Sequence, residues 1–269
     1  MPELPEVETV RRTLENLILN KIVTKIEVRY PKIIQTDVSD FNRILGQKIH
    51  RIDRLGKHLI FILDHDVLLI HLRMEGRFFL RDKDTALNKH EHIGFQLDHK
   101  QVLIYHDVRK FGTMHLYSIE TYLSESPLAK LGTEPMTMDV NSLYDQVSKR
   151  KTEIKTILLD QTVISGLGNI YVDETLFRAK IHPTRLGISL SKLEVENILM
   201  AAREVLHKAV LLGGTTIRTF EAMDGVHGRF QNELLVHTKV GEPCPVCGTT
   251  IIKMKVKGRG TYVCPRCQN

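Results

Sequence analysis

The sequence predicts an α+β protein: an N-terminal antiparallel β-sandwich with flanking helices, then a helical domain that ends in a small hairpin. Three observations favour this fold class. Short runs rich in β-branched residues fill the first half of the chain, helical periodicity replaces them from about residue 126, and all four cysteines lie after residue 243. With 269 residues and 42% hydrophobic content, the chain is long enough for two domains with cores of their own.

The first twelve residues, MPELPEVETVRR, predict a helix from about residue 3 to about residue 19. Its apolar residues recur at helical spacing and form one stripe: Val7, Val10, Leu14, Leu17 and Ile18. Proline at the first helical position and glutamate in the first turn are ordinary helix-starting residues. On this interpretation the opening residues have a structural role only.

The same opening residues also suit covalent catalysis. Removal of Met1 would expose Pro2 as a secondary amine, which can add to an aldehydic carbon and form an iminium ion. Glu3 lies within reach to deliver or accept a proton, and Glu6 follows on the same helix face. The residues alone leave the structural and the catalytic interpretation open.

Five short runs in the first half predict β-strands: IEVRY, HLIFIL, VLLIHLRM, IGFQL and VLIYHDV. Turns such as those at residues 64–66 and 98–100 separate them. Several short strands joined in this way favour an antiparallel sandwich.

Four segments after residue 126 have helical periodicity: SLYDQVSKR, TEIKTILLDQ, NIYVDETLFRAK and KLEVENILMAAREVLHKAVLL. Gly166 and Gly168 precede Asn169, so we expect two helices to meet there through a tight turn. The first N–H groups of the second helix could bind an anion, as in a DNA-binding helix-turn-helix. Simple helix packing explains the same glycines, so both interpretations stay open.

The cysteines form two C-x-x-C pairs, Cys244 with Cys247 and Cys264 with Cys267, separated by sixteen residues. This spacing predicts a zinc ribbon, in which four thiolates surround one structural zinc ion and leave no open position for substrate. The stretch TTIIKMKVKGRGTYV lies between the pairs. Apolar and basic residues alternate in it before a turn at residues 257–260, which predicts a hairpin with Arg259 at its tip. Arg259 suits either a solvated face or a phosphate contact.

The chain carries a formal net charge of +6 and has a pI of about 9.1, which makes a polyanionic partner plausible. Much of the excess charge lies after residue 243, where five basic residues and no acidic residue occur. No apolar run approaches the roughly 20 residues of a membrane span, and the N-terminus lacks the features of a secretory signal. We therefore expect a cytoplasmic protein that has no membrane partner.

Five segments together resemble the bacterial formamidopyrimidine-DNA glycosylase family: PELPEVETVRR, HLRMEG, HDVRKFG, SGLGNIYVDE and the zinc ribbon with GRGTYVCPRCQ. They span essentially the whole chain in the expected order. The resemblance implies a catalytic sandwich domain over 1–130, a helix-two-turn-helix domain over 131–235 and a zinc-ribbon finger over 236–269. It also implies a monomeric, nucleoid-associated repair enzyme that acts on double-stranded DNA containing oxidised purines or abasic sites.

The resemblance assigns the nucleophile to Pro2 and the general acid/base to Glu3. Pro2 would attack C1′ of the damaged nucleotide and form a Schiff base, and successive β and δ eliminations would cleave the strand. Glu6 would have a structural role. Lys57, which by itself would be taken for a solvated lysine at a strand start, matches a lysine near the phosphate of the lesion. We count Lys57 and Arg259 with the catalytic residues as well as with the DNA contacts.

The resemblance also assigns residues that hold the flipped base and its neighbours. Met74, Arg109 and Phe111 match the three residues that fill the space left by the base, where an apolar plug, a donor for the orphaned cytosine and an aromatic wedge are needed. By themselves, Met74 and Phe111 would be taken for core residues.

Three further residues and one loop match DNA-contacting parts of the family. Asn169 and Arg259 match the clamp on the phosphates around the flipped nucleotide, and Lys155 matches a lysine that faces the cleft near the lesion. The stretch from Thr216 to Gln231 matches a loop that covers the extruded base.

One segment departs from the family. The chain reads VHTKVGEPC before the ribbon, where relatives usually carry a tyrosine and a Gly-Arg pair, so no contact is assigned to His237 or Lys239. Two other functions also fit parts of the sequence. An endonuclease VIII-like enzyme for oxidised pyrimidines is disfavoured by PELPE, Met74 and HDVRKFG, and a non-catalytic DNA-binding protein would explain the ribbon and the charge.

Overall fold

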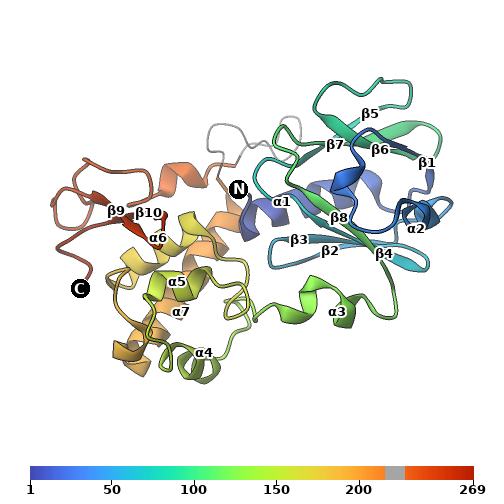
Figure 1. Ribbon diagram of the computed structural model, residues 1–269. Helices are drawn as coiled ribbons and strands as arrows, with labels where there is room; N and C mark the ends of the chain where they lie inside the picture. The colour runs from blue at the N-terminus through green and yellow to red at the C-terminus, as the bar shows by residue number, and fades with distance from the viewer. Residues whose placement is uncertain (216–227) are drawn as a thin grey trace. The chain divides into compact units, whose positions relative to one another are not determined.

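The computed structural model of the protein describes residues 1–215 and 228–269 (Figure 1). The chain divides into two compact units. The first consists of Met1–Ala129 with Gly213–Gly228, and the second of Lys130–Leu212 with Arg229–Asn269. Among the described residues, no helix combines the length and the hydrophobicity that crossing a membrane requires.

The first unit contains a sandwich of two antiparallel four-stranded sheets (Figure 1). One sheet has the strand order β1-β6-β7-β5 and the other the order β2-β3-β4-β8. Inward side chains of both sheets share one core, in which Phe61, Ile70, Phe95 and Leu103 are at most 2% exposed. The strands are β1 Val23–Val28, β2 Arg51–Leu55, β3 His58–Ile62, β4 Asp66–His71, β5 Arg77–Asp82, β6 Glu91–Leu97, β7 Gln101–His106 and β8 Thr113–Ser118.

All five predicted strands are present, and three further strands, β2, β5 and β8, were not predicted. Each of these three lies at the edge of its sheet. Edge strands carry many polar side chains because one side faces water, so they lack a continuous apolar pattern.

Helix α1 (Leu4–Ile18) confirms the predicted opening helix, and it packs against β2 and β3. Val7, Val10, Leu14 and Ile18 are fully buried, whereas Leu17 is 39% exposed. Leu17 therefore does not belong to the buried stripe, because one residue's step turns the side chain about 100° away from Ile18. Two single-turn helices, α2 Val38–Phe41 and α3 Tyr122–Glu125, complete the unit.

The second unit is mainly helical, as predicted. Helices α4 and α6 both pack on the long helix α7, and side chains such as Leu143, Val172 and Leu199 form its core. The helices are α4 Val140–Val147, α5 Ile154–Leu159, α6 Asn169–Arg178 and α7 Lys192–Leu211. Short 3-10 helices in the two units are η1 Pro31–Ile33, η2 Asn42–Ile44, η3 Pro127–Lys130, η4 Gly187–Ser189 and η5 Phe230–Glu233.

Helices α5 and α6 do meet beside the predicted glycines, but residues 160–168 join them, which is longer than a tight turn. The amide of Gln161 holds this connection by donating hydrogen bonds to the carbonyl oxygens of Leu159 and Leu167, at 3.1 and 2.9 Å. Gly166 adopts a φ of 94°, which favours glycine. The connection ends at Asn169, the first residue of α6.

The chain ends in the predicted hairpin, formed by β9 (Ile252–Val256) and β10 (Arg259–Val263). The two turn residues, Lys257 and Gly258, both have positive φ, as a two-residue type I′ turn requires. Arg259 pairs with Val256 and is therefore the first residue of β10, one position beyond the predicted tip.

Candidate active site

The start of α1 is fixed by a capping box between Glu3 and Glu6. The backbone N–H of Glu3 donates to Oε2 of Glu6 at 2.8 Å, and Glu3 is only 2% exposed. Pro2 is also buried, whereas Met1 is 46% exposed. The capping box directs the Glu3 carboxylate to the backbone N–H of Glu6, and Glu3 directly follows Pro2 in the chain, so a carboxylate is available next to a Pro2 amine for acid/base assistance.

Glu6 also holds a distant segment of the first unit. Its Oε1 accepts hydrogen bonds from the backbone N–H and from Oγ1 of Thr215, at 2.7 and 3.0 Å. A side chain at Gly214 would come within 2.6 Å of the same oxygen. Glu6 thus connects the start of α1 to the segment that leads into residues 216–227. Those residues, which make up most of the predicted covering loop, lie outside the part of the chain that the structure describes.

A second carboxylate places α1 at one end of the sandwich. Oε2 of Glu8 pairs with Nε of Arg54 at 3.1 Å, and Nη1 of Arg54 donates to the carbonyl oxygen of Gly56 at 2.9 Å. Burial acts to raise the pKa of Glu8, but hydrogen bonds from neighbouring arginines outweigh it and lower the pKa, so the pair is ionised. Gly56 has a φ of 56° and lies in the turn between β2 and β3. The next residue of this turn is Lys57, which is 5% exposed.

Strand register brings two loops to this same end of the first unit. His58 pairs with His71 and His71 pairs with Thr113, so the turn at Lys57 neighbours the ends of β4 and β8. Arg77 pairs with His106 on the other sheet. The loops 72–76 and 107–112 both cross between the sheets here, and they carry Met74 and the Arg109–Phe111 segment.

Tyr105 packs beneath both loops. It is fully buried, and a side chain at either Gly76 or Gly112 would clash with its hydroxyl group, at 2.3 and 1.6 Å. Both glycines are therefore required for the loops to approach the tyrosine. Burial raises the pKa of Tyr105, and the charge of Asp107 adds to this effect, so the ring stays neutral.

A buried carboxylate organises the longer loop. Oδ2 of Asp107 accepts hydrogen bonds from the N–H groups of Phe111 and Gly112, at 2.9 and 2.8 Å, and Oδ1 accepts one from Arg109 at 3.0 Å. Asp107 itself is fully buried. The backbone of the loop is thereby fixed from below, and its side chains point outward.

The predicted intercalating residues are exposed. Met74 is 37% exposed and Phe111 is 52% exposed, so neither is a core residue of this structure. The guanidinium of Arg109 lies over the ring of Phe111, 4.8 Å from its centre. Arg109 and Phe111 therefore lie beside one another, and Met74 is exposed on the other of the two loops.

Two histidines below these loops are neutral at physiological pH. The rings of His58 and His71 meet edge to face, 4.6 Å apart. Burial, with the nearby charge of Arg73, lowers the pKa of His58 to about 4. Burial and the neighbouring His58 and Arg73 lower the pKa of His71 to about 2.

In the second unit, Asn169 and the hairpin meet at one carbonyl group. Nδ2 of Asn169 donates to the carbonyl oxygen of Gly260 at 2.9 Å, and Nζ of Lys155 donates to the same oxygen at 3.1 Å. Arg259, the neighbour of Gly260, is exposed. Asn169 at the start of α6 thus contacts the residue that directly follows Arg259 in the hairpin.

Lys155 lies in the interior of the second unit. Its side chain is fully buried, and Nζ pairs with Oδ1 of Asp173 at 2.6 Å. Asp173 and the carbonyl group of Gly260 enclose its ammonium group, so the match of Lys155 to a lysine that faces the cleft near the lesion stays a prediction.

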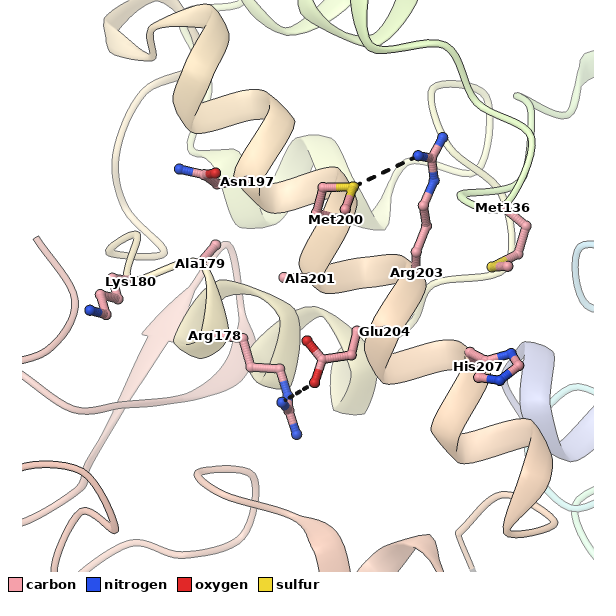
Figure 2. Close-up of a pocket in the computed structure, with 10 residues that line it drawn as sticks. All are labelled: Met136, Arg178, Ala179, Lys180, Asn197, Met200, Ala201, Arg203, Glu204 and His207. Carbon is pink, nitrogen blue, oxygen red and sulfur yellow. Dashed lines mark hydrogen bonds and ion pairs between the residues drawn. The ribbon is translucent and has the colours of Figure 1, made fainter.

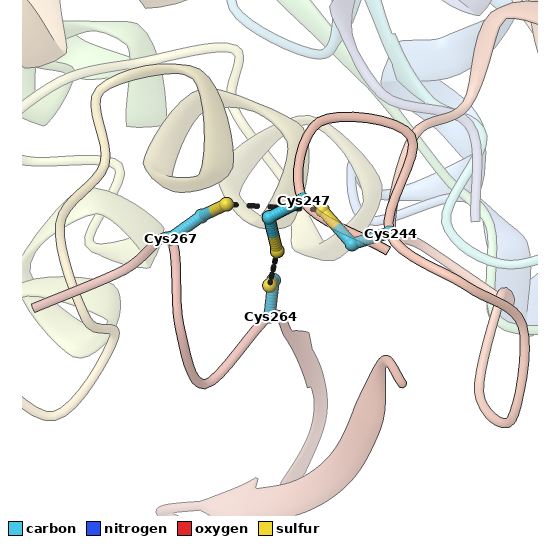
Figure 3. A group of neighbouring side chains, drawn as sticks. All are labelled: Cys244, Cys247, Cys264 and Cys267. Atoms are coloured by element: carbon cyan, nitrogen blue, oxygen red, sulfur yellow. Dashed lines mark hydrogen bonds between the residues drawn. The ribbon is translucent and has the colours of Figure 1, made fainter. Parts of the chain in front are cut away.

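The four cysteines form the predicted metal centre (Figure 3). Their Sγ atoms all lie within 4.8 Å of one another, with Cys244 and Cys267 at 3.8 Å and Cys247 and Cys264 at 3.5 Å. Thiolates bound at about 2.3 Å around a tetrahedral zinc ion would be roughly 3.8 Å apart. The four side chains therefore fit one structural zinc ion.

Sequence reasoning missed two residues of this arrangement, Asp107 and Asp173. Asp107 directly follows a strand and precedes a short loop that ends in glycine, which is a common setting for a carboxylate that binds loop N–H groups. Asp173 lies within helix α6, and the residues on both sides of it, from Tyr171 to Phe177, are buried. A charged residue in such a helix needs a partner, and this requirement could have identified it.

A pocket of about 730 Å³ lies elsewhere in the second unit (Figure 2). It is formed by the C-terminal end of α6, where Arg178 pairs with Glu204 at 2.6 Å, and by α7 with Met136 and Met200. None of the predicted site residues that the structure describes lines it. It is therefore separate from the site at the other end of α6.

Comparisons with known proteins match the whole chain. The sequence model of the formamidopyrimidine-DNA glycosylase N-terminal domain matches residues 1–114, that of the H2TH domain of this enzyme residues 131–221, and that of a zinc finger found in FPG and IleRS residues 241–269. Formamidopyrimidine-DNA glycosylases of Bacillus cereus and Oceanobacillus iheyensis are 48% and 45% identical over 273 residues. These alignments cover 100% of this chain and 99% and 98% of the relatives.

Solved structures of Lactococcus lactis Fpg are also similar to this chain over its full length. A Lactococcus lactis FPG mutant in complex with a Fapy-dG containing DNA matches with a TM-score of 0.95 and 43% identity, and the L. lactis Fpg complex with an abasic site containing DNA matches with a TM-score of 0.94 and 43% identity. Each covers 100% of both chains. Because the matched domains follow one another along the chain and the relatives are covered almost completely, the chain belongs to the formamidopyrimidine-DNA glycosylase family.

Proposed function

We propose that this chain removes oxidised purines, 8-oxoguanine and formamidopyrimidines, from double-stranded DNA and then cleaves the strand at the resulting abasic site. The observation that carries the proposal is its full-length likeness to formamidopyrimidine-DNA glycosylases, including structures bound to Fapy-dG containing DNA and to abasic-site DNA. The capping box that holds Glu3 beside Pro2 supports it.

In the proposed reaction, Pro2 is the nucleophile after removal of Met1. Its neutral amine attacks C1′ of the damaged nucleotide, and Glu3 supplies the proton that opens the deoxyribose ring. The bond from C1′ to the base breaks and the base leaves, which gives a protonated Schiff base. This electron sink acidifies the neighbouring C2′, and β then δ elimination expels the 3′ and 5′ phosphates.

The exposed loops of the first unit would fill the space that the flipped base leaves. Met74 and Phe111 would insert as apolar and aromatic wedges, and Arg109 would donate hydrogen bonds to the orphaned cytosine. The stacking of Arg109 on Phe111 supports a shared task, because both side chains are already held together.

Phosphate contacts would come from both units. Lys57, Asn169 and Arg259 would hold the phosphates around the flipped nucleotide, and Lys57 and Arg259 would thereby keep C1′ in place during catalysis. Asn169 stands at the start of α6, where the positive end of the helix dipole adds to the attraction for a phosphate.

The proposed division of labour follows three segments: catalysis and base probing by residues 1–130, backbone binding and lesion covering by 131–235, and phosphate binding by the finger over 236–269. We also propose that the enzyme acts as a monomer in the bacterial cytoplasm, on nucleoid DNA.

Borohydride trapping tests the proposal. The reagent reduces an iminium ion to a stable amine, so the chain should become covalently attached to a duplex that carries 8-oxoguanine opposite cytosine. A matched preparation whose Pro2 is blocked by a retained Met1 should bind the duplex but form no adduct. Full trapping by protein shown by mass spectrometry to begin uniformly at Met1 would exclude the proline mechanism. A duplex with an oxidised pyrimidine tests the endonuclease VIII-like alternative, which predicts faster excision there.

A further inference from the structure

A buried charge network crosses the second unit beneath the hairpin. Asp173 in α6 and Lys155 in α5 are both fully buried and pair at 2.6 Å. The second carboxylate oxygen of Asp173 lies 2.8 Å from Nδ1 of His237 and also accepts a hydrogen bond from the N–H of Tyr262 in β10 at 3.4 Å. One carboxylate thus contacts α5, the segment before the ribbon and the hairpin itself.

The network ends at the residue next to Arg259. Lys155 donates to the carbonyl oxygen of Gly260, which also accepts from Asn169. The two side chains that hold this carbonyl differ in exposure, since Lys155 is fully buried and Asn169 is partly exposed. The position of the Gly260–Thr261 peptide, directly after the residue that follows Arg259, is therefore set from α5 and α6.

The next residue of α6 fixes the chain on the other side. The carboxylate of Glu174 accepts hydrogen bonds from the N–H groups of Leu235, Val236 and His237, at 2.8 to 3.1 Å. Burial raises the pKa of Glu174 although these N–H groups act to lower it. Two successive acidic residues of α6 therefore bind the segment before the first cysteine pair and the hairpin between the two pairs.

The hairpin needs such anchors because it has little apolar core. Lys253, Lys255, Lys257 and Arg259 are exposed, and the cysteines hold only the end of the hairpin away from its turn. Zinc fixes the base of the hairpin, and the network fixes the strand that leaves its turn.

We propose that Asp173 is a positioning residue for Arg259: through Lys155 and Gly260 it sets where the arginine stands relative to Asn169. This inference rests on the proposed contact of Asn169 and Arg259 with DNA phosphates. On this inference Lys155 would affect DNA binding through the hairpin, without touching the nucleic acid itself.

The inference predicts a specific pattern for a charge-neutral replacement of the pair. The variant K155M/D173L removes both charges together, and such apolar replacement of a buried ion pair is often neutral for stability. Zinc content should stay at one ion per chain. Hydrogen exchange of the amides at 256–262 should accelerate at least tenfold, while those at 244–248 keep their protection.

A double-mutant cycle with R259A tests the consequence for DNA. K155M/D173L and R259A should each weaken binding of a lesion duplex roughly tenfold, as loss of one charge-assisted contact does. The combined variant should bind no worse than R259A alone, because both changes remove the same contact. L186A, which removes an exposed side chain of the second unit, is the matched control and should leave binding unchanged.

Two results would overturn the inference. Unchanged exchange at 256–262 would show that the pair does not hold the hairpin turn, whatever the chain binds. Additive losses in the cycle, about a hundredfold together, would show that the pair acts independently of Arg259. If K155M/D173L does not fold, K155M/D173N serves instead, since the asparagine side chain keeps an acceptor for His237. If the wild-type chain does not bind lesion DNA while the variant shows the expected change in exchange, the anchoring of the hairpin stands and the proposed function is refuted.

Discussion

Arg109 in the first unit and Arg259 in the second are both exposed, but different structures hold them. Arg109 lies in a loop whose backbone N–H groups are bound by the buried carboxylate of Asp107, above a sandwich core. Arg259 lies on a hairpin whose base is held by four cysteines and whose turn is tied to α6 through Gly260.

The comparison shows that the size of the hydrophobic core beneath an exposed residue determines which interactions are needed to fix its position. A loop over a large sandwich needs only its own polar groups satisfied, because packing already fixes its ends. A small hairpin buries too little apolar surface to fix itself, so it requires a metal ion and buried charges. The two arginines should therefore respond to different perturbations.

The largest effect should come from breaking the metal centre. C247A should release zinc and disorder the hairpin, because structural zinc contributes apparent binding energies of about 10–16 kcal/mol in zinc-finger peptides. Zinc per chain, exchange at 252–263 and affinity for lesion DNA measure this. V246A, which alters an exposed neighbour, is the control. Normal affinity in a verified zinc-free protein would contradict the view that the metal holds Arg259.

Breaking the loop of the first unit should have the next largest effect. D107A leaves three buried or half-buried N–H groups and the hydroxyl group of Tyr105 without their acceptor, which should cost on the order of 4 kcal/mol of unfolding free energy. Urea unfolding measures the loss, and zinc content should not change. D84A, at an exposed aspartate of the same unit, should have little effect. Equal losses in both variants would refute the role given to Asp107.

Acid should weaken the first unit specifically through His58 and His71. Their folded-state pKa values lie below the ordinary value of 6.5, so the unfolded chain binds more protons between pH 6.5 and about 4. Stability should therefore be fully present above pH 6.5 and fall by on the order of 3 kcal/mol for each of the two histidines as the pH is lowered to about 4. Urea unfolding at several pH values tests this. H71N should flatten the profile, and an unchanged slope would contradict it.

The smallest effects should separate the two arginines by function. R109A should erode the preference for cytosine opposite the lesion by about 1–3 kcal/mol, because on the proposed function the donors of Arg109 would face the orphaned base. R259A should weaken binding equally for all four opposite bases and reduce the salt slope by roughly one unit. Affinity and single-turnover excision, measured for each opposite base at several salt concentrations, distinguish them. The reverse pattern would exchange the two roles.

Local pattern predicted the elements whose stability is local. The apolar spacing of Val7, Val10 and Leu14 identified α1, and the two C-x-x-C pairs identified the metal centre. A helical stripe and a turn that presents two thiolates are properties of a few neighbouring residues, so the sequence contains them in full. The same holds for the five strands with apolar runs and for α7.

Pairing and burial were decided only by the tertiary structure. The edge strands β2, β5 and β8 are stabilised by pairing with the neighbouring strands of their sheets, and their own residues contain no local pattern that predicts a strand. Met74 and Phe111 look like core residues in the sequence but are exposed, whereas Lys155, which matches a lysine that faces a cleft, is fully buried. Burial of a charge depends on whether a partner arrives from elsewhere in the chain. Asp173 lies 18 residues away from Lys155 and Gly260 lies 105 residues away, so only the folded chain could bring them to its ammonium group.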